Sequence, residues 1–206
     1  LDLNLGYTFD TFIVGKSNEL AHAAAAAVSE NPGFVYNPLV IYSDVGLGKT
    51  HLLHAIGHRV RAKGMSLIYA TTEEFTNEYI KAIRDGKTEE FRGRFRSTDV
   101  LLLDDLQFLI GKEQTQEGFF HTFNDLHNSG YQIVITSDRP PKALALLEDR
   151  LRSRFASGLL ADIQPPDLET RMAIPSTKVE LLLVELDESI IPLIAKRAVS
   201  YSHLPP

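Results

Sequence analysis

The stretch that most constrains the fold is residues 43–50, SDVGLGKT, which follows an apolar run and precedes a helix-compatible run. A strand, a glycine-bearing loop, Gly-Lys-Thr and a helix in this order is the layout of a phosphate-binding P-loop. Gly46 and Gly48 let the backbone turn tightly, so that N–H groups approach phosphate oxygens. Lys49 can reach the terminal phosphates, and the Thr50 hydroxyl can hold Mg²⁺. We therefore predict a site for a nucleotide with Mg²⁺; the alternative is a structural loop that matches the pattern by chance.

Ser43 occupies the place where this pattern usually has its first glycine. Serine is small, but it lacks glycine's freedom to adopt a positive φ. We therefore expect the start of this loop to differ slightly from that of other P-loops.

Composition excludes several classes of protein. The chain has 206 residues with 21 basic and 27 acidic side chains, a net charge of −6, so any contact with DNA must come from a local patch. It has no cysteine, which excludes disulfides and cysteine-based zinc sites and fits a cytoplasmic location. No apolar stretch is long enough for an integral membrane segment, and the first residues lack a signal-peptide pattern.

Short apolar runs alternate with helical patterns along the chain. The runs cover residues 39–42, 67–70, 100–103, 133–136 and 158–163. The third run, residues 100–103, is fully apolar, which is typical of a central parallel strand that is covered on both faces. We predict an α/β fold, a three-layer αβα sandwich around a five-stranded parallel sheet. In the helix that opens at Thr72, we expect Phe75, Tyr79, Ile80 and Ile83 to share the buried face.

Carboxylates follow two of these predicted strands. Asp104 and Asp105 end the third strand, and Asp138 ends the fourth. Ligands bind outside the carboxyl ends of parallel strands, so these acids should lie beside the P-loop. Asp104 is a candidate Mg²⁺ ligand, Asp105 a candidate for polarising the attacking water, and Asp138 a candidate sensor of the terminal phosphate. The alternative for each is a turn or helix cap.

Arg150 and Arg154 are four residues apart and share a helical face. They could reach a nucleotide held by a neighbouring subunit as arginine fingers. The alternative is a solvated face paired with Glu148 and Asp149.

The histidines at 51, 54 and 58 have no carboxylate or cysteine nearby to complete a metal site, so we interpret them as polar positions on the P-loop helix.

Seven strings follow one another in a specific order along the chain: YTFDTF at 7–12, GLGKTHL at 46–52, LDDLQF at 103–108, KEQTQE at 112–117, FFHTFN at 119–124, SDRPP at 137–141 and EDRLRSRF at 148–155. By these strings, the chain from about Tyr7 to Arg171 resembles the AAA+ domain of the DnaA family of bacterial replication initiators.

The resemblance implies an ATP-driven switch, a weak ATPase that assembles into a filament on the chromosomal origin and melts it. The positions of the family motifs also imply the site residues. The implied nucleotide-binding residues are Gly46, Leu47, Gly48, Lys49, Thr50, His51 and Arg150, and the implied metal ligands are Thr50 and Asp104. The implied catalytic residues are Asp105, Asp138 and Arg154, and the residues implied to contact single-stranded DNA are Thr76, Lys112, Gln114 and Thr115. Gln114 stands where the family often has arginine, which would weaken contact with phosphate. The implied partners are further copies of the chain, origin DNA and other replication proteins.

The end of the chain departs from this family. We expect residues 1–164 to form the nucleotide-binding core and residues 165–206 a partial or atypical helical lid. Pro175 should interrupt the first lid helix, residues 187–197 resemble a lid helix despite Pro192, and no sensor 2 arginine is visible. The duplex-binding and N-terminal partner-binding domains are not present, so we expect a fragment or a truncated relative. These departures leave open a second function, a regulatory or adaptor module that binds nucleotide without significant hydrolysis and docks on another initiator subunit; a helicase loader is less favoured.

Overall fold

A five-stranded parallel sheet lies at the centre of the protein. The computed structural model describes the backbone of residues 2–182 and 190–197, and the expectations for the other residues fall outside this part of the chain. The strands are β1 (Leu39–Tyr42), β2 (Leu67–Thr71), β3 (Val100–Asp104), β4 (Gln132–Ser137) and β5 (Leu159–Asp162). They lie in the order β2-β3-β4-β1-β5, and every adjacent pair is parallel. The predicted fold class is therefore confirmed.

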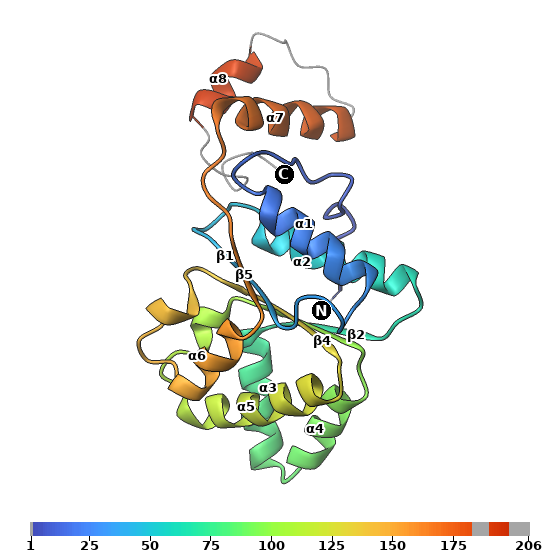
Figure 1. Ribbon diagram of the computed structural model, residues 1–206, viewed down its shortest axis with the longest axis vertical. Helices are drawn as coiled ribbons and strands as arrows, with labels where there is room; N and C mark the ends of the chain where they lie inside the picture. Colours follow the sequence, from blue (N-terminus) through green and yellow to red (C-terminus); the bar gives the residue numbers. More distant parts are fainter. Residues whose placement is uncertain (1, 183–189, 198–206) are drawn as a thin grey trace.

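Helices cover both faces of the sheet (Figure 1). One face carries α1 (Glu19–Glu30) and α2 (Lys49–Ala62), and the other carries α3 (Thr72–Arg84), α4 (Thr88–Arg96), α5 (Glu113–Asn128) and α6 (Asp149–Ala156). Two short 3₁₀ helices, η1 (Leu106–Leu109) and η2 (Pro141–Ala143), follow β3 and β4. None of the helices in the described residues is both long and apolar enough to cross a bilayer.

The two faces of the sheet bury different side chains. In β1, Leu39 and Ile41 pack with α1 and α2, whereas Val40 packs with the helices of the opposite face, because successive side chains of a strand alternate. The α1/α2 side is aliphatic and alanine-rich. The opposite side is built on five fully buried phenylalanines: Phe75, Phe95, Phe119, Phe123 and Phe155. Burial of β1, β3 and β4 on both faces explains the apolar runs within their sequences.

The buried face of α3 differs from the expected one. Phe75 and Tyr79 are buried as predicted, but Ile80 and Ile83 are each 41% exposed and Ala82 is buried instead. The helix turns 100° per residue, so positions 75, 79 and 82 form one stripe and positions 80 and 83 lie beside it. The expectation for the two isoleucines was wrong.

The helix that contains Pro175 is not interrupted there. α7 (Leu168–Leu182) runs through this residue, so the predicted break is wrong. Proline removes one helical hydrogen bond and costs about 3 kcal/mol in a helix interior. Two contacts hold the preceding turns in place: Asp167 accepts a hydrogen bond from the Thr170 backbone N–H at 2.9 Å, and Ile174 is buried against Ile13 and Ile194.

The last described helix, α8 (Ile190–Arg197), packs against α7. Pro192 lies in its first turn, where backbone N–H groups have no helical acceptor, so it costs no hydrogen bond. The part of the predicted lid helix at residues 187–189 lies outside the described residues.

Candidate functional site

The loop between β1 and α2 has the backbone that a P-loop requires. Gly46 and Gly48 have φ values of 78° and 100°, which favour glycine, and Gly48 is the N-cap of α2. Ser43 does not have a positive φ, since Asp105 is the only non-glycine residue with one among the described residues. The serine at the first position is therefore compatible with the loop without backbone strain.

Lys49 is buried against this loop, with only 7% of its surface exposed. Its ammonium group donates to the backbone oxygens of Ser43 and Asp44, each at 2.9 Å, and to the Ser43 hydroxyl at 3.1 Å. Burial lowers the pKa of Lys49, although the charges of Asp105 and Asp104 act in the opposite direction. Within the described residues Lys49 forms no salt bridge, so this buried cation has only neutral oxygen atoms as direct partners.

Asp104 lies at the tip of β3 beside the start of α2. One carboxylate oxygen accepts from the Thr50 hydroxyl at 2.9 Å and from the Tyr69 hydroxyl at 3.4 Å, and the other accepts from the Thr136 hydroxyl. Burial, with the charge of Asp104, raises the pKa of Tyr69, so the phenol keeps its proton and donates. Three strands and α2 thus fix this carboxylate, and the predicted pair Thr50 and Asp104 is brought together.

Asp105 has a left-handed backbone conformation, with φ 62° and ψ 58°. Such a conformation in a non-glycine residue costs of order 1–3 kcal/mol and persists only where surrounding contacts hold it. Here the Asp105 backbone N–H donates to the Thr136 hydroxyl at 2.9 Å. Burial, and then the neighbouring charge of Asp104, raises the pKa of the Asp105 carboxyl above its ordinary value.

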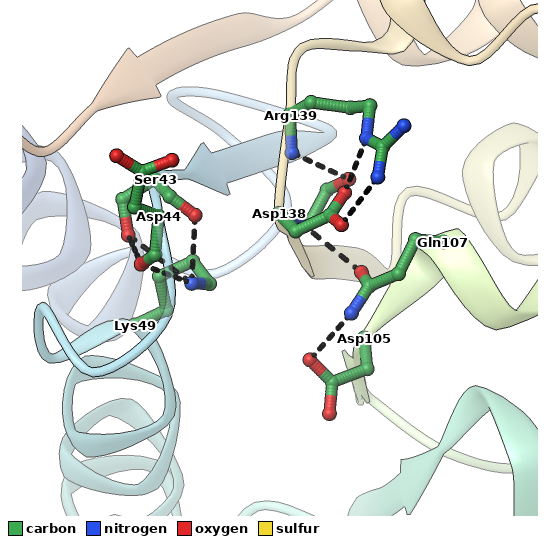
Figure 2. A network of polar contacts seen from close by, with 8 residues as sticks. Ser43, Asp44, Lys49, Asp105, Gln107, Asp138 and Arg139 are labelled. Atoms are coloured by element: carbon green, nitrogen blue, oxygen red, sulfur yellow. Dashed lines mark hydrogen bonds and ion pairs between the residues drawn. The ribbon is translucent and has the colours of Figure 1, made fainter. Parts of the chain in front are cut away.

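Asp138, at the tip of β4, faces both Arg139 and the η1 turn (Figure 2). The Arg139 guanidinium donates to both carboxylate oxygens of Asp138, at 2.8 and 2.7 Å. The Asp138 backbone N–H donates to the side-chain oxygen of Gln107 at 3.2 Å, and the Gln107 amide donates to Asp105 at 3.1 Å. Lys49, Asp105 and Asp138 therefore line the same edge of the sheet, as predicted.

The histidines of α2 hold the N-terminal segment. His51 contacts the Thr8 carbonyl oxygen at 2.7 Å, His54 accepts from the Asn4 backbone N–H at 2.8 Å, and His58 contacts the Asn4 carbonyl oxygen at 2.8 Å. No cluster with the composition of a metal site occurs among the described residues. These contacts are local polar interactions, and His51 places the N-terminal segment next to the P-loop helix.

The α6 arginines lie on a helix that is anchored by buried Leu151 and Phe155. Arg150 pairs with Glu148, and its guanidinium lies 4.3 Å from the centre of the Phe120 ring. Arg154 forms no ion pair with any other residue in the described part of the chain. In the described chain neither arginine has a hydrogen bond or ion pair with the P-loop, so they are not part of the polar network at the sheet edge.

The four residues expected to contact DNA differ in exposure. Lys112 and Gln114, at the start of α5, are exposed. Thr115 is 2% exposed and Thr76 is 1% exposed, and the Thr76 hydroxyl donates to the Thr72 carbonyl oxygen at 2.7 Å. Lys112 and Gln114 therefore present side chains to a ligand in this structure, whereas the two threonines are packed inside.

Four further residues join the site without having been predicted: Tyr69, Gln107, Thr136 and Arg139. For Gln107, Thr136 and Arg139 the signal is position, because each lies within two residues of an acid at the end of a predicted strand. Tyr69 lies in the middle of a predicted strand and has no such signal. Gln107 is two residues after Asp105, and Thr136 is two residues before Asp138.

The donor set fits a magnesium nucleotide. A buried ammonium with neutral partners favours an anionic ligand, since a buried charge is costly unless it is paired. A helix N-terminus capped by glycine presents backbone N–H groups and the positive end of its dipole to phosphate. A hydroxyl and a carboxylate are oxygen ligands of the kind that Mg²⁺ prefers.

Comparisons with known proteins give the same assignment. The family model for the bacterial DnaA ATPase domain matches residues 3–162. The chromosomal replication initiator protein DnaA of Chloroflexus aurantiacus is 58% identical over 197 residues, which are 95% of this chain and 41% of that protein. The chain thus spans less than half the length of this curated relative.

Two solved structures have the same fold. Domain III of the Thermotoga maritima replication initiation protein DnaA superimposes with a TM-score of 0.94 at 46% identity, covering 98% of this chain and 85% of that one. A replication initiator DnaA bound to AMPPCP and single-stranded DNA gives a TM-score of 0.91 at 41% identity, covering 97% of this chain and 62% of that one. From the motifs, the fold and these matches, the chain belongs to the bacterial DnaA ATPase domain family.

Proposed function

We propose that this chain is the ATP-binding AAA+ module of a bacterial replication initiator. It binds ATP or ADP with Mg²⁺, hydrolyses ATP slowly, assembles with further copies on the chromosomal origin in the cytoplasm, and promotes opening of the duplex. Family membership supports this function, as does a relative of the same fold bound to AMPPCP, an ATP analogue, and single-stranded DNA.

The observation that carries the proposal is the junction of the P-loop with β3. Lys49 is a buried cation with neutral partners, and the Thr50 hydroxyl lies 2.9 Å from the Asp104 carboxylate. This junction of two chain segments therefore offers a positive charge for phosphate oxygens next to a pair of oxygen ligands for a metal. These are the two requirements of a site for a magnesium nucleotide.

Thr50 and Asp104 would hold Mg²⁺, which neutralises charge on the polyphosphate when it is bound. Tyr69 and Thr136 keep the Asp104 carboxylate in place through their hydroxyl groups. The Lys49 ammonium stabilises negative charge on the transferred phosphoryl group. The backbone N–H groups at the start of α2 orient the phosphates.

Asp105 orients the attacking water and accepts hydrogen bonds from it. Its raised pKa makes it a better proton acceptor than a freely solvated aspartate. Arg154 has no ion-pair partner within the described residues, so it is available to act in trans on the nucleotide of an adjoining subunit. A dilute monomer has no adjoining subunit to supply this arginine to its own nucleotide, so it should hydrolyse ATP slowly.

Lys112 and Gln114 are the residues through which we propose contact with single-stranded DNA. Both are exposed at the start of α5. The Lys112 ammonium can pair with a phosphate, whereas Gln114 can only donate a hydrogen bond. With one cation, this segment should bind weakly and with little dependence on salt for each copy of the chain.

Nucleotide titration with and without Mg²⁺, read out by thermal unfolding, tests the binding. A ligand at a hundredfold excess over its Kd stabilises the folded state by about 2.7 kcal/mol. A folded sample whose melting temperature is unchanged by millimolar ATP and ADP would contradict the proposal.

ATP turnover by Asp105→Asn, which keeps the shape of the side chain, tests hydrolysis. We expect a rate well below that of the unmodified chain under assembling conditions. Equal rates combined with normal nucleotide binding would instead favour the regulatory or adaptor module that binds nucleotide without hydrolysis.

A further inference from the structure

Gln107 links two acids of the candidate site. It belongs to the LDDLQF string at 103–108, but no role was assigned to it above. It lies in the η1 turn, where Leu106 and Leu109 are fully buried and fix the turn against the core. The Gln107 side chain is half-buried and points between Asp105 and the tip of β4 (Figure 2). The turn therefore presents this amide at the sheet edge on a rigid support.

The two hydrogen bonds of Gln107 fix the orientation of its amide. The amide NH₂ donates to a carboxylate oxygen of Asp105 at 3.1 Å, and the amide oxygen accepts from the Asp138 backbone N–H at 3.2 Å. An ionised carboxylate only accepts and a backbone N–H only donates, so the reverse orientation would lose both bonds. Only a side chain with one donor end and one acceptor end spans these two groups.

The Asp105 carboxylate is held by few other groups. Its backbone has the left-handed conformation described above and is fixed by Thr136, but this contact does not restrict rotation of the side chain. Gln107 is the only side chain in the described residues with a recorded hydrogen bond to this carboxylate. Asp104, by contrast, accepts from three hydroxyl groups.

We infer that Gln107 is a positioning residue that aims the Asp105 carboxylate at the attacking water and ties its orientation to the tip of β4. This inference rests on the proposed function. A neutral donor suits the task because it orients the carboxylate without neutralising its charge. Through its second bond, Gln107 also connects the Asp105 carboxylate to the backbone of Asp138. A shift at the end of β3 or of β4 would therefore be passed to the other strand.

Three variants of the full chain separate the two bonds. Gln107→Met has a similar length and loses both bonds, whereas Gln107→Glu keeps the acceptor for Asp138 but loses the donor to Asp105. Gln164→Met is the matched control, because Gln164 is exposed and its amide also donates to an aspartate two residues earlier, Asp162, at 2.7 Å.

Single-turnover ATP hydrolysis under assembling conditions, together with nucleotide affinity from fluorescence titration, measures the effect. We expect Gln107→Met and Gln107→Glu each to slow hydrolysis by roughly tenfold while the Kd for ATP changes by less than about threefold. Gln164→Met should match the unmodified chain in both quantities. In an Asp105→Asn background, Gln107→Met should have almost no further effect, because the carboxylate that it positions is absent.

The outcomes distinguish this inference from the proposed function. Equal rates for the unmodified chain and Asp105→Asn would overturn hydrolysis and the role of Gln107 together. A clear effect of Asp105→Asn combined with an unchanged rate in both Gln107 variants would overturn the role of Gln107 alone. Loss of ATP affinity with an unchanged single-turnover rate would also overturn it, because a group that only positions Asp105 does not hold the nucleotide.

Discussion

The carboxyl edge of the sheet and helix α6 contain the two groups of charged residues expected to act on ATP, and their surroundings differ. At the sheet edge, Lys49 and Asp104 are buried and each has three hydrogen-bond partners within the chain. On α6, Arg150 pairs with Glu148 and lies over the Phe120 ring, whereas Arg154 has no ion-pair partner within the described residues. The residues proposed to hold the nucleotide are pre-organised within one chain, whereas Arg150 is exposed and Arg154 is half-buried outside this network.

This difference assigns separate tasks to the two regions. Buried and satisfied polar networks fix geometry, and charges in them act more strongly than in water. An exposed arginine is screened by solvent and gains strength only when a neighbouring molecule covers it. Binding should therefore be a property of the single chain, and rapid hydrolysis a property of the assembly.

Arg154→Ala should have the largest effect. We expect ATP hydrolysis under assembling conditions to fall by up to about a thousandfold, to the rate of the dilute protein, because an arginine finger supplies that order of rate enhancement. ATP affinity of the monomer should not change. Arg152→Ala, on the same helix and paired with Asp149, is the control. Mixing Arg154→Ala with Asp105→Asn should restore part of the activity if the arginine acts in trans, and no recovery would count against the division of tasks.

Lys49→Met should abolish tight nucleotide binding in the monomer itself. Loss of a buried charge that pairs with a ligand typically costs 2–5 kcal/mol, so we expect the Kd for ATP to rise by roughly a hundredfold or more. Lys63→Met removes a lysine from the other end of α2, where it pairs with Glu30 at the surface, and should leave the affinity unchanged. A thermal-shift titration measures both. Equal losses in the two variants would mean that total charge, and not the P-loop lysine, controls binding.

The pH dependence of stability at His54 tests whether the N-terminal segment is held by the same pre-organised network. Burial, and then the charge of His58, lowers the pKa of His54 to about 4. The unfolded chain therefore binds a proton below its ordinary pKa of about 6.5, while the folded chain stays neutral until about pH 4. The stability that comes from the neutral ring is present above pH 6.5 and is lost as the pH falls toward 4.

Chemical unfolding at several pH values measures this loss. We expect a decrease of about 1 kcal/mol for each pH unit between 6.5 and 4, and a flatter profile in His54→Gln, which can still accept from the Asn4 backbone N–H. His121→Gln, at an exposed position of α5, should keep the profile of the unmodified chain. Identical profiles for all three proteins would mean that His54 titrates equally in the folded and unfolded states.

Local sequence patterns predicted the parts of the molecule that depend on short segments. The five apolar runs and the glycines of the P-loop were sufficient to predict the strands and the loop, since burial on both faces and a positive φ each require particular residues. Asp104 and Asp105 were placed correctly at the sheet edge because Asp104 ends β3 and Asp105 follows it directly. The helix break predicted at Pro175 was wrong. Proline disfavours a helix interior, but Pro175 lies inside α7, where the preceding residue, Ile174, is buried in tertiary contacts.

Contacts between neighbouring strands were not visible in the sequence. The Thr136 hydroxyl donates to Asp104 and the Asp138 backbone N–H donates to Gln107, and both bonds exist because β3 lies beside β4. The left-handed conformation of Asp105 also has no sequence signal comparable to a glycine. Burial of Thr76 depends on the packing of α3, so a residue expected to contact DNA can lie inside.

Substitution of Ser43 should have the smallest effect on stability and on ATP binding. It measures how far the P-loop tolerates a residue other than glycine at its first position. The Ser43 hydroxyl is one of three partners of Lys49, and its own proton goes to the Asp44 carbonyl oxygen at 2.8 Å. Ser43→Gly removes this partner and adds freedom to the unfolded chain, so we expect a loss of about 0.5–1 kcal/mol of stability.

Ser43→Ala removes the hydroxyl but not the backbone restriction, so it isolates the hydrogen bond to Lys49. Because two carbonyl oxygens still hold the ammonium, both variants should bind ATP within about threefold of the unmodified chain, the scale of a single net hydrogen bond. A tenfold change in Ser43→Ala alone would show that the hydroxyl, and not the backbone of the loop, sets the position of Lys49. The pre-organisation of the sheet edge would then depend on a side chain that the usual P-loop pattern lacks.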